Sequence, residues 1–254
     1  IYGIAEGNTI FTVQTVDGHA ETSIGVTVPQ VMPTTRLNAY VYKDVFDSAP
    51  IDDQRWYSIN TDNISEAWIN ALTDREEQYF TDHEYIINAS AYVGGKVYGY
   101  GKTRAGAGFF AMDPNTMMPI YTGVNPGRQV KAVAYDHATD TMYAIARNDV
   151  IGEFNSLYRV NLPIGTLEEI ASIQTSDEEG NAISIDTLSI SQSGAAYGLS
   201  RGTTNRKPSL YRIDLANGQC TLIGETTMDY LPSMYVVTVY DYKNELIITY
   251  DPYN

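Results

Sequence analysis

One strand–turn–strand phrase recurs along the chain and constrains its fold more than any other sequence feature. In residues 209–224, SLYRIDLANGQCTLIG, apolar side chains alternate with Arg212 and Asp214. Alternation with a period of two is typical of a half-buried strand. Asn217-Gly218 is a favoured two-residue turn because both positions accept a positive φ, and a second strand follows over Cys220–Ile223. The segment therefore predicts a β-hairpin.

Four other segments repeat this phrase with different residues. Each repeat begins with an aromatic anchor, and the five anchors are separated by 46, 53, 48 and 53 residues: Phe11, Tyr57, Phe110, Tyr158 and Tyr211. A second recurring short strand lies upstream of four of these hairpins and starts at Tyr2, Tyr98, Tyr143 and Tyr197. Three of these short strands follow a further apolar run, at 89–93, 130–135 and 185–190.

A unit of four strands in about fifty residues predicts an all-β fold of the β-propeller class, built from four-stranded blades. A β-sandwich is the alternative, although it does not require one phrase at near-constant spacing. We expect a single propeller domain over 1–254 with five or six blades, and a terminal blade that is incomplete or closes the ring. The units are expected near 1–28, 29–75, 86–124, 129–174, 184–227 and 231–254. Residues 26–55 and 73–85 are interpreted as long inserted loops.

The composition narrows the classes of partner. A formal net charge of −15 disfavours nucleic acid and anionic membrane surfaces, because both require a cationic footprint. No run of 18 apolar residues occurs, so we expect no membrane span. The chain begins at Ile1 without a Met, and any signal or lipid-anchor segment is expected to have been removed. An acidic composition correlates with a secreted or cell-surface setting, and the expected location is extracytoplasmic: periplasmic, cell-surface or secreted.

Motifs that carry catalytic or cofactor chemistry are missing from the sequence. Gly101-Lys102-Thr103 is not a phosphate loop, because Lys96 stands where that motif needs a glycine. The three histidines lack zinc-ligand spacing, and no Gly-x-Ser-x-Gly elbow occurs. We therefore predict no catalytic residue, no metal ligand and no cofactor. Calcium stays open through two acidic groups, Asp136 with Asp140 and Asp149, and Asp177 with Glu178 and Glu179, although solvated turn carboxylates are the alternative.

Cations recur at one position of the repeat. Four residues after the recurring tyrosine stand Glu6, Lys102, Arg147 and Arg201, so three of the four copies carry a cation there. In a propeller this position emerges at one end of the ring, with Arg104 and Arg128 in neighbouring loops. A carboxylated or sulfated ligand would find charge-assisted donors there. The alternative is that each cation pairs with a local carboxylate.

Aromatic residues suggest a second candidate surface. Trp56 and Trp68 flank one turn, and Tyr40 lies beside them in the least regular unit. Such side chains stack on sugar rings or anchor a protein partner. Packing within and between blades is the alternative.

The phrase running from Leu210–Asp214 to Thr221–Gly224 resembles the "LYxID…G…T…IG" repeats of secreted or lipid-anchored propeller proteins of Bacteroidetes. The resemblance implies a binding or scaffolding module. We therefore expect a non-catalytic extracytoplasmic propeller that binds a protein or glycan through loops on one ring face. The alternative is a carbohydrate hydrolase or lyase with carboxylates in the central channel, because propellers host both kinds of function.

Overall fold

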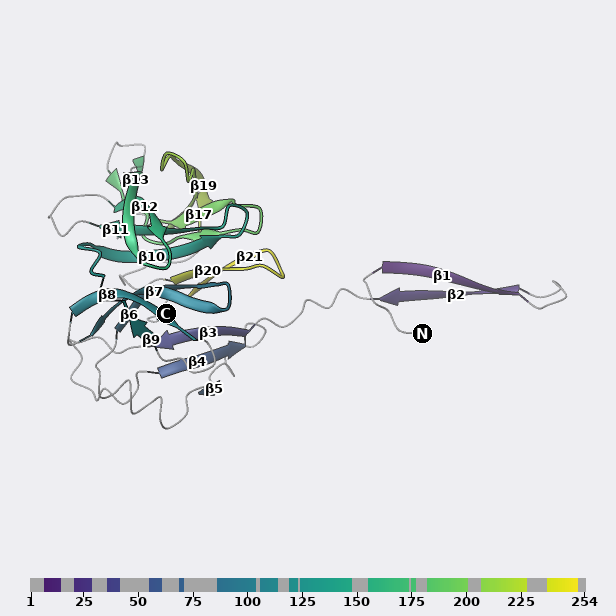
Figure 1. Ribbon diagram of the computed structural model, residues 1–254. Helices are drawn as coiled ribbons and strands as arrows, with labels where there is room; N and C mark the ends of the chain where they lie inside the picture. The colour runs from purple at the N-terminus through teal and green to yellow at the C-terminus, as the bar shows by residue number, and fades with distance from the viewer. Residues whose placement is uncertain are drawn as a thin grey trace.

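The computed structural model describes residues 7–14, 21–28, 36–41, 55–60, 69–70, 86–103, 106–113, 119–122, 124–147, 155–173, 175–176, 182–200, 207–227 and 237–250. Every regular element among these residues is a β-strand (Figure 1). A search of these residues for a helix of the length and apolarity that a membrane crossing requires finds none. The predicted all-β class is confirmed for the part of the chain that the structure describes.

Three antiparallel sheets each hold four strands in chain order. Sheet I consists of β6 (Ile86–Val93), β7 (Lys96–Thr103), β8 (Gly106–Met112) and β9 (Pro119–Tyr121). Sheet II consists of β10 (Gln129–Asp136), β11 (Thr141–Arg147), β12 (Asn155–Asn161) and β13 (Thr166–Ser172). Sheet III consists of β16 (Ser189–Ile190), β17 (Ala196–Leu199), β18 (Ser209–Ile213) and β19 (Cys220–Glu225). The predicted four-stranded unit is thus confirmed in three copies.

Four smaller sheets complete the described elements. They are β1 (Gly7–Gln14) with β2 (Glu21–Val28), β3 (Arg36–Val41) with β4 (Arg55–Asn60) and β5 (Ile69–Asn70), β14 (Thr175–Ser176) with β15 (Ala182–Ile183), and β20 (Val237–Asp241) with β21 (Leu246–Tyr250). The interpretation of 26–55 as one long loop is wrong, because β2 extends to Val28 and β3 pairs with β4 along its whole length. Residues 73–85 lie outside the described residues.

The first strands of successive sheets are neighbours: β6 contacts β10, β10 contacts β16, and β16 contacts β20. The sheets therefore pack face to face in chain order, as the blades of a propeller do. Alternation along β11 shows how one strand serves two neighbours. Met142, Ala144 and Ala146 enter the core shared with sheet I, whereas Tyr143 and Ile145 enter the core shared with sheet III. We call these two cores seam I/II and seam II/III; the fold is β-propeller-like.

The glycine that follows the recurring tyrosine has a packing reason. A Cβ on Gly99 would overlap the carbonyl oxygen of Ala89 and meet the Phe110 ring at 2.8 Å. A Cβ on Gly198 would overlap Ile185 in the same way. The second strand of the unit therefore needs a very small residue where the neighbouring strand approaches closely.

Four hairpins share one four-residue loop, at 137–140, 162–165, 215–218 and 242–245. Each loop follows an Asp or Asn and ends at a residue with positive φ, namely Asp140 (56°), Gly165 (88°), Gly218 (72°) and Glu245 (54°). The two-residue turn predicted at Asn217-Gly218 is therefore wrong. The Asp214 carboxylate accepts a hydrogen bond from the Ala216 backbone N–H at 2.9 Å, which starts the turn two residues earlier.

Candidate ligand-binding hollow between two sheets

The four-residue loops define one end of sheets II and III, which we call the hairpin-loop end. A hollow of about 590 Å³ lies there between the two sheets. Its lining is rich in charged and hydrogen-bonding groups from both sides: Asp136, Thr139, Tyr143, Arg159, Gly194, Arg212, Ile213, Asp214, Leu215, Ala216, Gln219 and Thr221. A concave site with several polar groups fits a polar ligand rather than an apolar one.

Two lining residues, Arg159 and Arg212, occupy the same position in successive repeats. Arg159 lies opposite Tyr143 in the β11–β12 ladder, and Arg212 lies opposite Tyr197 in the β17–β18 ladder. The Arg212 guanidinium lies 5.4 Å from the centre of the Tyr197 ring. Tyr211 and Ile213, on either side of Arg212, enter seam II/III, so Arg212 and Tyr197 lie on the other face of sheet III. The Arg212 side chain is therefore held against an aromatic ring at this end of the molecule.

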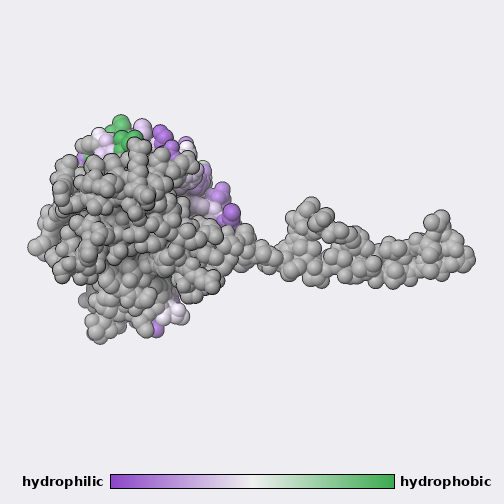
Figure 2. All heavy atoms as spheres, turned by 90° about the horizontal axis from the view of Figure 1, so that it is seen from below, coloured by the Kyte–Doolittle hydropathy of each residue, from purple (hydrophilic) through white to green (hydrophobic). Residues whose placement is uncertain are grey.

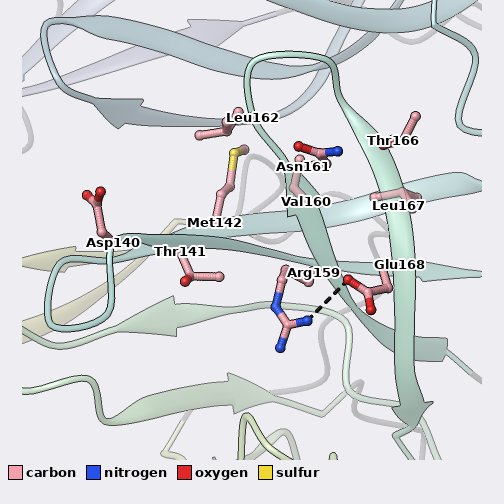
Figure 3. Close-up of a pocket in the computed structure, with 10 residues that line it drawn as sticks. All are labelled: Asp140, Thr141, Met142, Arg159, Val160, Asn161, Leu162, Thr166, Leu167 and Glu168. Carbon is pink, nitrogen blue, oxygen red and sulfur yellow. Dashed lines mark hydrogen bonds and ion pairs between the residues drawn. The ribbon is translucent and has the colours of Figure 1, made fainter.

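The Arg159 guanidinium also borders a second hollow, of about 430 Å³, formed by the ends of β11, β12 and β13. Figure 3 shows Arg159 directed toward Glu168, with Thr141 and Asp140 to its side. The Arg159 Nη1 to Glu168 Oε2 distance is 3.1 Å, and both side chains are half or more exposed. Exposed ion pairs contribute only about 0–1 kcal/mol, so a ligand carboxylate would displace Glu168 at little cost.

The buried carboxylates at this end are occupied by their own turns. Asp136 accepts hydrogen bonds from the Ala138 N–H at 2.9 Å and from the Thr139 hydroxyl at 2.6 Å. Asp241, on β20, accepts hydrogen bonds from the Lys243 N–H at 3.0 Å and from the Asn244 side-chain amide at 2.7 Å. These bonds hold the loops in shape, and they favour a structural role for both acids over proton transfer.

The cations predicted from the repeat lie away from the hollow where they are described. Arg147 is exposed at the last position of β11, opposite the first residue of β12, whereas the hollow lies beyond the start of β11. Lys102 holds the corresponding backbone position in β7, where it pairs with Ile86. Arg128 lies 3.6 Å from Glu169 and over the Tyr158 ring, which is the local pairing given as the alternative. Arg104 and Arg201 lie outside the described residues.

The predicted aromatic surface is described only in its backbone. The register of β3 and β4 places Tyr40 directly opposite Trp56. Trp68 lies outside the described residues. Sequence reasoning missed Arg159 and Arg212, although both stand in the recurring phrase, as Leu-Tyr-Arg-Val-Asn at 157–161 and Leu-Tyr-Arg-Ile-Asp at 210–214. An arginine at the same place in two copies was the signal that could have found them.

Neither calcium candidate lies wholly within the described residues, so calcium binding stays a prediction. Asp136 and Asp140 take part in the loop after β10, where Asp140 accepts a hydrogen bond from the Tyr135 hydroxyl. Among the residues that the structure describes, no group of three His, Cys, Asp or Glu side chains could hold a metal ion. Asp149, Asp177, Glu178 and Glu179 lie outside these residues.

Apolar exposure is scattered over the described surface. On the face seen in Figure 2, a small hydrophobic group lies beside hydrophilic residues. The large apolar side chains with more than half of their surface exposed are Tyr92, Ile120, Leu222 and Ile223, from three different strands or loops. Single exposed apolar residues are common on proteins, so they do not define a site.

Comparisons with known proteins add little to this geometry. A scan against protein-family models matches none, and a search of curated proteins finds no similar sequence. TolB from Acinetobacter baumannii is 12% identical, with a TM-score of 0.47 over 98% of this chain and 61% of that chain. An oligogalacturonate lyase from Vibrio parahaemolyticus is 14% identical, with a TM-score of 0.40 over 85% of this chain and 53% of that chain. The chain thus spans less than two thirds of either structure, and likeness at this level carries no inference about ligand or reaction.

Proposed function

We propose that the chain is a non-catalytic, extracytoplasmic propeller of five or six blades that binds a carboxylated or sulfated protein or glycan. Ring closure is supported by the loops after β10 and β20, which belong to different sheets separated by sheet III. The His137 and Tyr242 rings of these loops lie 5.0 Å apart, so the stack of sheets curves around an axis. The sequence resemblance to repeats of secreted or lipid-anchored propellers supports the location.

The observation that carries the binding function is the hollow between sheets II and III. Arg159 and Arg212 supply planar donors that suit carboxylate and sulfate groups. Thr139, Thr221 and Gln219 add neutral hydrogen-bonding groups to the lining. Such a mixture binds an acidic, hydroxyl-rich or peptide ligand without requiring a reactive group.

The alternative is a carbohydrate hydrolase or lyase. A glycosidase of the usual kind needs two carboxyl groups on either side of the scissile bond. Asp136 and Asp241 are the buried carboxylates of the described residues, and their turn hydrogen bonds favour the binding function. The two functions separate when polygalacturonate, alginate, heparin and neutral dextran are incubated with the protein and assayed for new reducing ends or unsaturated products.

Binding to the same four polysaccharides is the test of the proposal, by calorimetry at low and high salt. We expect at least one acidic polymer to bind, with affinity falling as salt rises, and the Arg159→Ala/Arg212→Ala variant to bind about tenfold more weakly. Arg128→Ala is the matched control, because Arg128 pairs with Glu169 and does not line the hollow.

A second double variant, Arg147→Ala/Arg201→Ala, tests the opposite end of the sheets that the sequence predicted. Loss of binding in this variant, with normal binding by Arg159→Ala/Arg212→Ala, would move the site to that end. Cleavage of any of the polymers would replace the binding function with the enzymatic one.

A further inference from the structure

Four rings at the ends of β10 and β20 and in the loops that follow form a contiguous group, which we call the tyrosine–histidine cluster: Tyr135, His137, Tyr240 and Tyr242. The ring centroids of Tyr135 and His137 are 4.9 Å apart with an interplanar angle of 81°. His137 meets Tyr242 at 5.0 Å and 88°, and Tyr242 meets Tyr240 at 5.3 Å and 62°. Each ring thus presents its edge or a tilted face to the next, which is a favourable arrangement for aromatic pairs.

The cluster has a buried base and an open side. Tyr135 is only 8% exposed and belongs to seam I/II. Tyr242 is 39% exposed, and His137 is also exposed. The Tyr242 hydroxyl makes a long hydrogen bond of 3.5 Å to the backbone carbonyl of Tyr135. Aromatic surface is therefore held in place from below while parts of two rings remain in contact with solvent.

Carboxylates surround these rings. The hydrogen bond from the Tyr135 hydroxyl to Asp140 is the main cause that raises the pKa of Tyr135 to about 12, with burial and the charges of Asp140 and Asp136 adding to it. Burial and then the charge of Asp136 raise the pKa of Tyr242.

Tyr240 stands in a similar environment. Its pKa is raised by burial first, and then by the charge of Glu245, by Tyr197 and by Asp241. Segments 135–140 and 240–245 together hold four acidic residues, and Lys243 is their one lysine or arginine. The local field at the cluster is therefore negative, in agreement with the net charge of −15.

We propose that the tyrosine–histidine cluster binds a cationic side chain, the lysine or arginine of a partner polypeptide, against the open rings of Tyr242 and His137. A cation is attracted to the negative face of an aromatic ring, and the surrounding carboxylates add to that attraction. Asp140 and Glu245 would repel an anionic group at these rings, which are not part of the lining of the hollow, and a neutral sugar would gain nothing from their charge. The proposal goes beyond the hollow, whose arginines take no part in it.

The test is an NMR titration of the aromatic ring signals with three otherwise identical Gly/Ser peptides, which carry one lysine, one trimethyllysine or one norleucine. Norleucine keeps the alkyl chain and lacks the ammonium group. We expect the Tyr242 and His137 signals to shift with both cationic peptides and to respond about tenfold more weakly to norleucine. Added salt should weaken the response to the cationic peptides.

Two variants separate ring chemistry from loop packing. Tyr242→Phe keeps an aromatic face and should bind the cationic peptides nearly as well as the natural chain, whereas Tyr242→Leu should bind about tenfold more weakly. Tyr92→Leu is the matched control, because Tyr92 is 59% exposed and lies outside the cluster. Equal responses to the lysine and norleucine peptides, or equal binding by the Tyr242→Leu and natural chains, would overturn the proposal. Because the titration uses no acidic polymer, its failure is distinguishable from failure of the proposed function.

Discussion

Seam I/II and seam II/III use corresponding strand positions, but larger side chains fill the first. Four pairs of corresponding residues, seam I/II first, are Tyr100 and Ile145, Phe109 and Leu157, Tyr135 and Ile190, and Met142 and Ala196, whereas Val160 and Ile213 differ in the opposite sense. All ten are buried. In each of these four pairs the residue of seam II/III is the smaller one, and the larger of the two hollows lies at that seam.

The difference also affects the hairpin loops. The loop after β12 is tied to sheet I, because the Tyr100 hydroxyl donates a hydrogen bond of 2.8 Å to the Gly165 carbonyl. In sheets II and III the position of Tyr100 is taken by Ile145 and Leu199. Because neither side chain has a hydroxyl, neither can make this hydrogen bond to a loop of the next sheet. The loop after β18 instead contributes Asp214, Leu215 and Ala216 to the lining of the hollow. One repeat thus produces a closed seam where these side chains are large and a hollow where they are small.

The largest expected effect comes from truncating the two seams at corresponding positions. Phe109→Ala should lower the free energy of unfolding by about 3–5 kcal/mol. Leu157→Ala should lower the free energy of unfolding by less. The Phe109→Ala variant additionally loses the ring contacts of Phe109 with Tyr98 at 5.9 Å and with Tyr100 at 5.0 Å. Urea midpoints at unchanged m-value measure both variants. An equal or larger loss in Leu157→Ala would show that the aromatic side chains do not make seam I/II the tighter one.

A smaller effect is expected from the two loop glycines. Gly218→Ala should lower the free energy of unfolding by about 1–2 kcal/mol, the penalty of the left-handed conformation for an L-residue. The added Cβ would lie 3.1 Å from the Ala171 Cβ, a close contact without overlap. Gly165→Ala should cost more, because its Cβ would overlap the Phe109 ring. The same urea experiment compares them. Combining Gly165→Ala with Phe109→Ala should cost less than the sum, and strict additivity would count against the overlap.

The smallest expected effect is a pH dependence of stability. It is confined to seam I/II, because the residue corresponding to Tyr135 in seam II/III is Ile190, which does not titrate. The pKa of Tyr135 lies near 12 in the fold and about 10 in an unfolded chain. The unfolded chain therefore loses this proton first, so the contribution of Tyr135 is complete below pH 10 and is lost as pH rises toward 12. Tyr135→Phe should flatten the fall in stability across this window, as followed by urea midpoints. Tyr92→Phe serves as the control, and an equally flat profile there would contradict the assignment.

Local patterns predicted most of the strands. Alternation around Tyr98, Tyr143 and Tyr211 indicated their strands correctly, because period two reflects the pleat itself. The strand at Arg36–Val41 was missed because Pro29, Pro33 and a polar stretch surround it, while pairing with β4 decides its conformation. The turn length after Asp214 was predicted wrongly. The hydrogen bond from the Ala216 N–H to the Asp214 carboxylate starts the turn before Asn217-Gly218 and overrides the preference of Asn-Gly for a two-residue turn.

The hollow follows from a different level of organisation. It depends on volume differences between residues far apart in the chain, such as Met142 and Ala196, and no short pattern contains that comparison. The repeat did contain Arg159 and Arg212, but alternation identifies them only as solvent-facing residues. Their position at the border of a hollow becomes evident only in the packed arrangement of sheets II and III.

The hydrogen bond between Tyr242 and the carbonyl of Tyr135 joins residues 107 positions apart. The hairpins close short stretches of chain, whereas this contact requires an entire intervening sheet to be in place. Chains rich in such distant contacts fold slowly, because the entropy of closing the long segment is lost before the contact is gained. The individual sheets are therefore expected to form early, and the joining of the loops after β10 and β20 to be a late event in folding.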